Sequence, residues 1–183
     1  MRAPYGLNIL DNCVSCPIRG EHLFCNLPLP AAQRLNEIKS TAVYPKGAML
    51  FIEGQQPRGV FVLCAGKAKL STSSREGKTI ITKISDSGDI LGLNGVVSNR
   101  PYEVTAEMME PGQANFVPRD SFLHMLKDFP EVAMRVAQQL SRTTTPRMRR
   151  FARWDWRFRR PLNLPSCCFR GRPRPRKMTD RRM

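Results

Sequence analysis

Residues 59–70 read GVFVLCAGKAKL, and this stretch decides the fold. Its first six residues form an apolar run, rich in β-branched and aromatic residues, that predicts a buried strand. Gly66 interrupts the run. Residues 67–72 then alternate polar and apolar side chains, which is the pattern of a strand with one buried face. The stretch therefore predicts two successive strands with a glycine break between them.

Shorter segments with the same character lie on both sides of this stretch. Turn signals such as Pro45-Lys46-Gly47 and Glu53-Gly54 separate them. A tighter segment begins at residues 90–93. Short strands at regular spacing with glycine-rich turns predict a sandwich or barrel rather than alternating strands and helices. The further strands that we expect are residues 42–44, 49–52, 78–84, 103–108 and 114–117.

Helical patterns flank the strands. We expect helices over residues 31–38 and 119–128, and a third from Glu131 to Arg142 that begins after Pro130. The third helix carries its apolar residues on one face. These residues are Val132, Val136 and Leu140.

Charge divides the chain of 183 residues, whose formal net charge is +15. Residues 143–183 hold 14 basic and two acidic residues, a net charge of +12, whereas residues 1–142 carry only +3. So sharp an asymmetry marks a boundary. We predict a cysteine-containing segment over residues 1–27, a sensor domain with the start of a dimer helix over 28–142, and a basic, disordered tail over 143–183.

Several functional classes find no support in the sequence. No run approaches the roughly 18 to 20 apolar residues of a membrane span, and no secretory signal is visible, so we expect a cytoplasmic protein without a membrane partner. Six cysteines then indicate free thiols or a metal site rather than disulfides. No catalytic grouping is recognisable, so we do not expect an enzyme.

Five short motifs together resemble the sensor domain of the Crp/Fnr family of bacterial transcription regulators. Their glycines stand where a β-roll needs tight turns. The resemblance covers residues 20 to 142 and implies a mainly β fold: a double-stranded β-helix, or jelly roll, of the cyclic-nucleotide-binding type with short flanking helices. The motifs are Tyr44–Gly47, Phe51–Gly54, Gly59–Leu63, Gly66–Leu70 and Gly88–Gly92.

The resemblance also implies a ligand pocket near the segment that follows residue 90. Family members that bind cyclic AMP use a glutamate for the ribose and an arginine for the phosphate. Here Leu93 stands in place of the glutamate, and Glu103 would repel a phosphate. The sequence therefore argues against cyclic AMP. The candidate pocket residues are Gly92, Leu93, Asn94, Arg100 and Tyr102.

The N-terminal cysteines allow three interpretations. Cys13 and Cys16, with two residues between them, are followed by His22 and Cys25. The Fnr branch of the family holds an iron–sulfur cluster on a similar group. Alternatively, Cys13, Cys16, His22 and Cys25 would complete a tetrahedral zinc site. In the third interpretation the thiols hold no metal and pack against the sheet.

The iron–sulfur interpretation has two departures from the family pattern. Family spacing would put the third cysteine where His22 stands, and the distant fourth cysteine near Asn115. Cys64 lies inside an apolar strand, and we interpret it as a small buried hydrophobic residue.

The tail does not resemble the family. There the helix after Pro130 forms a dimer interface, and a helix-turn-helix domain follows. Here Pro146 is expected to stop the helix. A basic arm with interleaved aromatic residues can bind nucleic acid through phosphates and stacking. The candidate residues are Arg147, Arg149, Arg150, Arg153, Trp154 and Trp156.

A frameshift explains the tail in another way, and we favour it. Codons shifted by one frame across Trp154-Asp155-Trp156 would encode leucine, valine or methionine, then glycine, then leucine, as in the family's dimer helix and following turn. We therefore predict the sensor domain of a Crp/Fnr-type regulator, weakened as a homodimer, whose DNA partner belongs to the intact architecture. The alternative is a stand-alone sensor or metal- and redox-binding module that acts through protein partners, with a tail that binds nucleic acid non-specifically.

Overall fold

The computed structural model describes residues 4–151, except for 18, 21, 23, 75 and 76, and it describes side chains as far as Ser141. The chain divides into two compact units, Met1–Pro146 and Arg147–Met183. The first unit contains every strand of the described residues, and the account below concerns that unit.

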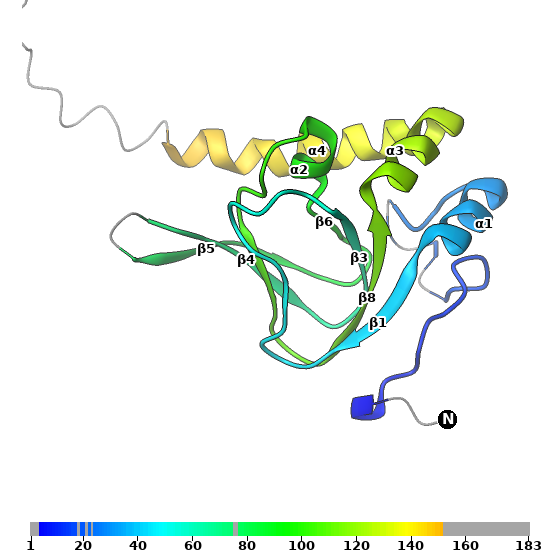
Figure 1. The fold of residues 1–183 in the computed structure, drawn as a ribbon, viewed down its shortest axis with the longest axis horizontal. Helices are drawn as coiled ribbons and strands as arrows, with labels where there is room; N and C mark the ends of the chain where they lie inside the picture. The colour runs from blue at the N-terminus through cyan, green and yellow to red at the C-terminus, as the bar shows by residue number, and fades with distance from the viewer. Residues whose placement is uncertain (1–3, 18, 21, 23, 75–76, 152–183) are drawn as a thin grey trace, which may run out of the picture. The chain divides into compact units, whose positions relative to one another are not determined.

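Eight strands of the described residues form two antiparallel sheets of four strands each (Figure 1). The order is β1-β8-β3-β6 in one sheet and β2-β7-β4-β5 in the other. This double-sheet arrangement confirms the predicted jelly roll. The strands are β1 (Ser40–Tyr44), β2 (Met49–Phe51), β3 (Gly59–Ala65), β4 (Ala68–Ser73), β5 (Thr79–Ser85), β6 (Ile90–Leu91), β7 (Thr105–Met108) and β8 (Gly112–Pro118).

Four α-helices of the described residues lie beside the roll, and a short 3-10 turn, η1 (Pro4–Gly6), precedes them. The helices are α1 (Leu29–Ile38), α2 (Leu93–Ser98), α3 (Arg119–Asp128) and α4 (Pro130–Phe151). The sequence predicted α1 and α3 but expected no helix at α2. With only six residues, α2 is too short to show a helical period. Gly92, at φ +83°, turns the chain out of β6 into this helix.

Helix α4 corrects the sequence prediction. We expected it to end at Arg142, but it continues past Pro146 to Phe151. Proline removes one backbone hydrogen bond and clashes with the preceding turn, and here these effects do not end the helix. The basic, disordered tail over residues 143–183 stays a prediction, and α4 includes its first residues as far as Phe151. Arg147, Arg149 and Arg150 lie on helical backbone, whereas Arg153, Trp154 and Trp156 lie outside the described residues.

Strand β3 separates two hydrophobic cores. Val60 and Val62 face a core built with the helices, and Phe61 and Leu63 face the interior of the roll. Because both faces are buried, the strand reads as a continuous apolar run.

Helix α4 packs its apolar face onto its own domain. Val132 and Val136 are buried in the helical core, and Leu140 packs against it. On the same helix, Gln139 Nε2 donates to Asp89 Oδ1 at 3.5 Å. The three residues that we assigned to a dimer helix therefore stabilise the fold of the single chain.

Candidate functional site

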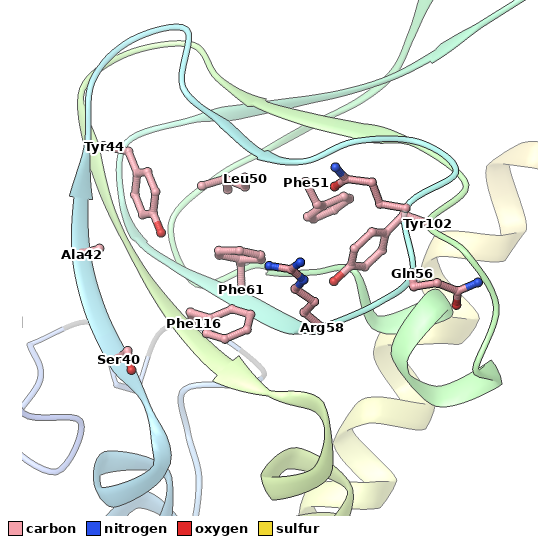
Figure 2. A pocket seen from close by; sticks show the side chains of 11 residues that line it. Ser40, Ala42, Tyr44, Leu50, Phe51, Gln56, Arg58, Phe61, Tyr102 and Phe116 are labelled. Atoms are coloured by element: carbon pink, nitrogen blue, oxygen red, sulfur yellow. The ribbon is translucent and has the colours of Figure 1, made fainter.

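A cavity of about 670 Å³ lies between the two sheets (Figure 2). Its walls come from β1, β3 and β8 on one side and from β2 on the other. Most of the side chains around it are apolar, and five of them are aromatic. The apolar lining residues are Ala42, Tyr44, Leu50, Phe51, Phe61, Tyr102 and Phe116.

Tyr102 forms a rigid part of the wall. Its ring stacks on Phe51 with the two ring centroids 4.1 Å apart, and its hydroxyl donates to the carbonyl of Gly59 at 2.6 Å. Burial raises the pKa of the Tyr102 hydroxyl above its ordinary value. The hydroxyl therefore stays protonated at neutral pH and keeps its hydrogen bond.

Polar side chains also contribute to the walls of the cavity. Ser40, Gln55, Gln56 and Arg58 contribute to its lining, and Figure 2 shows the Arg58 guanidinium directed inward among the rings. The backbone of Arg58 is held in place because its carbonyl accepts from the N–H of Arg119 at 2.9 Å. Aromatic walls with one guanidinium suit a ligand that has a flat apolar part and an anionic group.

The predicted pocket residues do not gather around this cavity. Only Tyr102 lines it. Leu93 is buried in the helical core, and Gly92 lies where an added Cβ would come 2.9 Å from the Tyr102 ring. Asn94 and Arg100 are exposed.

Sequence reasoning missed Arg58, Tyr44 and Phe116 as lining residues. The alternation of polar and apolar residues along β1 and β8 indicates that some of their side chains lie inside the roll. It gave no indication that the loop before β3 would turn Arg58 inward.

The four described cysteines gather at a second, smaller cavity. Cys13, Cys16, Cys25 and Cys64 all line it, together with Asn115. His22 does not line it and instead lies against Gly88, where an added Cβ would come 2.0 Å from the imidazole. Within the described residues, no group of three or more histidine, cysteine or acidic side chains could hold a single metal ion. The metal assignment from the sequence stays a prediction.

Residues 41–129 match the cyclic nucleotide-binding domain family. The chain is also 24% identical, over 107 residues, to the CRP-like cAMP-activated global transcriptional regulator of Mycobacterium tuberculosis. That alignment covers 58% of this chain and 46% of the relative. The chain therefore spans about half the length of the curated relatives that it matches.

Solved structures share the fold. The catabolite activator protein of Thermus thermophilus superposes with a TM-score of 0.64 at 18% identity, over 71% of this chain and 61% of that one. The sensor domain of the transcriptional regulator DNR from Pseudomonas aeruginosa superposes with a TM-score of 0.59 at 23% identity, over 79% of this chain and 93% of that one.

None of the described helices is long and apolar enough to cross a membrane. Two four-stranded sheets, the flanking helices, the matched family and the shared fold all agree with the resemblance seen in the sequence. Residues 41–129 thus form a domain of the cyclic nucleotide-binding type, and the chain is similar in sequence and in fold to transcription regulators of the Crp/Fnr kind.

Proposed function

We propose that this domain is the sensing part of a transcription regulator and that a small molecule held in the aromatic cavity is its signal. The names of the similar proteins describe regulators of transcription, which supports this role. In this proposal, DNA is the partner of the regulator with its intact architecture. The regulator is located in the cytoplasm, and the domain performs no catalysis. A ligand would act by binding one state of the domain better than another.

The observation that carries this proposal is the cavity between the sheets. Its rings offer stacking surfaces, and Arg58 offers a charge-assisted hydrogen bond to an anion. Cyclic AMP fits less well. The position expected for the ribose-binding glutamate holds Leu93, which is only 5% exposed and belongs to the helical core.

The test uses two probes, anilinonaphthalene sulfonate and cyclic AMP. The first combines fused rings with an anionic group, and its fluorescence rises in an apolar site. We expect saturable binding of this probe, weakened about fivefold to tenfold in Arg58→Gln because one charge-assisted hydrogen bond is lost. Cyclic AMP should neither bind nor displace the probe.

Arg34→Gln is the matched control, because Arg34 pairs with Glu37 on the solvent-exposed face of α1, away from the residues that line the cavity. It should bind the probe as the unmodified protein does. Near-ultraviolet circular dichroism must show native packing, since loosely packed states also bind this dye. Equal binding by both variants, or tight binding of cyclic AMP, would contradict the proposal.

A further inference from the structure

Arg58 contacts two different parts of the domain. Its side chain lines the aromatic cavity, and Figure 2 shows the guanidinium directed inward. Its backbone carbonyl accepts a hydrogen bond of 2.9 Å from the N–H of Arg119, which is the first residue of α3. The same residue therefore reaches the place where a ligand would lie with its side chain, and the start of a helix with its backbone.

The Arg58 guanidinium is available to a ligand. No carboxylate of the described residues forms an ion pair with it, and none of the described residues that line the cavity is acidic. An anion in the cavity would thus pair with this cation without displacing another carboxylate. Once paired, the side chain restrains the backbone of its own residue.

Gly59, the next residue, connects the same two parts again. Its carbonyl accepts from the Tyr102 hydroxyl at 2.6 Å, and its backbone pairs with Pro118 at the end of β8. An added Cβ at Gly59 would lie 2.2 Å from the Val117 carbonyl oxygen, so the two strands approach each other very closely here. A shift of the cavity wall at Gly59 is therefore passed to the end of β8, from which α3 continues.

Helices α3 and α4 are joined so closely that they should shift together. Phe129 alone separates them. Its N–H donates to the Met125 carbonyl at 3.0 Å, and its carbonyl accepts from the N–H of Val132 at 2.9 Å. Phe122 of α3 and Val132 of α4 are fully buried in the same core. Because a closely packed core transmits strain, a displacement at the start of α3 reaches α4.

We propose that the hydrogen bond from the N–H of Arg119 to the carbonyl of Arg58 couples occupancy of the aromatic cavity to helices α3 and α4. This regulation rests on the proposed function, since it needs an anionic ligand at Arg58. Such a ligand favours the arrangement of residues 58–59 in which it contacts the guanidinium, and the hydrogen bond makes that arrangement favour one position of α3. The coupling is reciprocal, so loss of the bond weakens both the response of α4 and the binding of the ligand.

The first test uses the unmodified full chain and two probes with the same rings. Anilinonaphthalene sulfonate carries an anionic group, and N-phenylnaphthylamine is the same ring system without it. Both probes are used at equal fractional saturation, and amide hydrogen exchange is followed by mass spectrometry. We expect the anionic probe to slow exchange in residues 119–141 at least about fivefold more than the neutral probe does, because only the anion holds Arg58.

The second test removes the hydrogen-bond donor with Arg119→Pro. Proline is well tolerated at the first position of a helix. The preceding residue, Pro118, has φ −57° and ψ 144°, which is the extended conformation that a following proline requires. We expect this variant to bind the anionic probe about fivefold more weakly and the neutral probe within about twofold of the unmodified protein. The additional slowing of exchange in residues 130–141 should be lost.

Arg119→Ala is the matched control. It removes the same side chain, including the 3.6 Å contact with Asp120, but keeps the backbone N–H. The anionic probe should therefore slow exchange in this variant as it does in the unmodified protein. Near-ultraviolet circular dichroism checks the fold of both variants. If Arg119→Pro folds poorly, the comparison of the two probes on the unmodified chain decides by itself.

Three outcomes would overturn the coupling alone. The first is saturable binding of the anionic probe with equal exchange under both probes, and the second is an unchanged response in well-folded Arg119→Pro. The third is loss of the response in Arg119→Ala, which would assign it to the side chain. Absence of saturable binding of the anionic probe to the unmodified protein would instead overturn the proposed function, and the coupling with it, so the two failures are distinguishable.

Discussion

Tyr102 shows how one side chain joins the cavity wall to the backbone. Its hydroxyl bonds the carbonyl of Gly59 at 2.6 Å, and its ring stacks on Phe51. We expect Tyr102→Phe to keep the stacking and to lower the free energy of unfolding by about 1 kcal/mol through the lost hydrogen bond. Urea denaturation measures this difference. Tyr44→Phe, at the same cavity, is the control, and an equal loss there would refute this account of Tyr102.

The buried thiol of Cys64 should make the free energy of unfolding depend on pH. Burial raises the pKa of its thiol from 9.0 to about 12. Between these values the unfolded chain has released the proton while the folded chain still holds it, so the free energy of unfolding falls as pH rises above about 9. One such thiol contributes up to about 1.4 kcal/mol per pH unit.

Metal-free Cys64→Ala should therefore lose stability less steeply than the unmodified protein between about pH 9 and about pH 10.5. Denaturation at several pH values under reducing conditions gives both slopes. The two proteins differ only at residue 64, so the difference between the slopes reports the thiol of Cys64 together with its electrostatic coupling to Cys25, Cys13 and Lys39. Identical slopes would show that the thiol is not desolvated.

Cys64 also shows which properties of a residue can be predicted from the neighbouring sequence and which cannot. The apolar run around it predicted burial correctly. Its grouping with the other three thiols depends on which face of β3 the N-terminal segment covers, and Gln113 and Asn36 decide that through hydrogen bonds to backbone. Neither residue carries a sequence signal for that role.

Strand β3 depends on close approach to β8. An added Cβ at Gly59 would lie 2.2 Å from the carbonyl oxygen of Val117 and against the Phe116 ring. Gly59→Ala should therefore lower the free energy of unfolding by about 1–3 kcal/mol, because the two strands must separate. Denaturation measures it. Gly20→Ala is the control, since open space surrounds Gly20, and an equal effect there would remove the steric explanation.

Leu93, the first residue of helix α2, occupies the position where relatives that bind cyclic AMP have a ribose-binding glutamate, and substituting it tests that difference. Leu93 is buried in the helical core, so Leu93→Glu should destabilise the domain by about 3 kcal/mol or more through burial of an unpaired carboxyl group. It should not create binding of cyclic AMP. Denaturation and titration calorimetry measure these two results. Leu93→Met should cost less than about 1.5 kcal/mol, and a stable Leu93→Glu variant that binds cyclic AMP would contradict this reading.

Helices and strands were predicted correctly from the sequence where their hydrophobic pattern extends over enough residues to be recognised. The longer strands showed apolar runs or alternation, and the glycine breaks between them are real turns. Helix α2 was missed because six residues carry too little periodicity. The prediction ended helix α4 too early because Pro146 reads as a stop signal, whereas the helix continues to Phe151.

Most of the net positive charge of the whole chain belongs to its last 41 residues. Residues 143–183 carry a net charge of +12, so the full chain should bind a labelled single-stranded oligonucleotide and lose at least about 100-fold in affinity between about 50 and 200 mM salt. A version ending at Pro146, the limit of the first compact unit, should bind far more weakly. Fluorescence anisotropy measures both. Salt-independent binding, or equal binding by both chains, would assign the affinity elsewhere.

For the molecule as a whole, the sequence predicted the two-sheet roll and the flanking helices because their signals are local and repeated. It did not predict the aromatic cavity. That site depends on residues far apart in the chain: Tyr44, Arg58 and Phe116 of one sheet and its preceding loop face Leu50 and Phe51 of the other sheet.

The turn between β5 and β6 has a mechanical consequence. His22 rests on Gly88, and the next residue, Asp89, holds Lys83 at 2.8 Å and Gln139 of α4 at 3.5 Å. The N-terminal segment and helix α4 thus contact adjacent residues, Gly88 and Asp89, of one turn. A displacement of the N-terminal segment at His22 would therefore be transmitted through this turn to helix α4. We expect the two elements to move together.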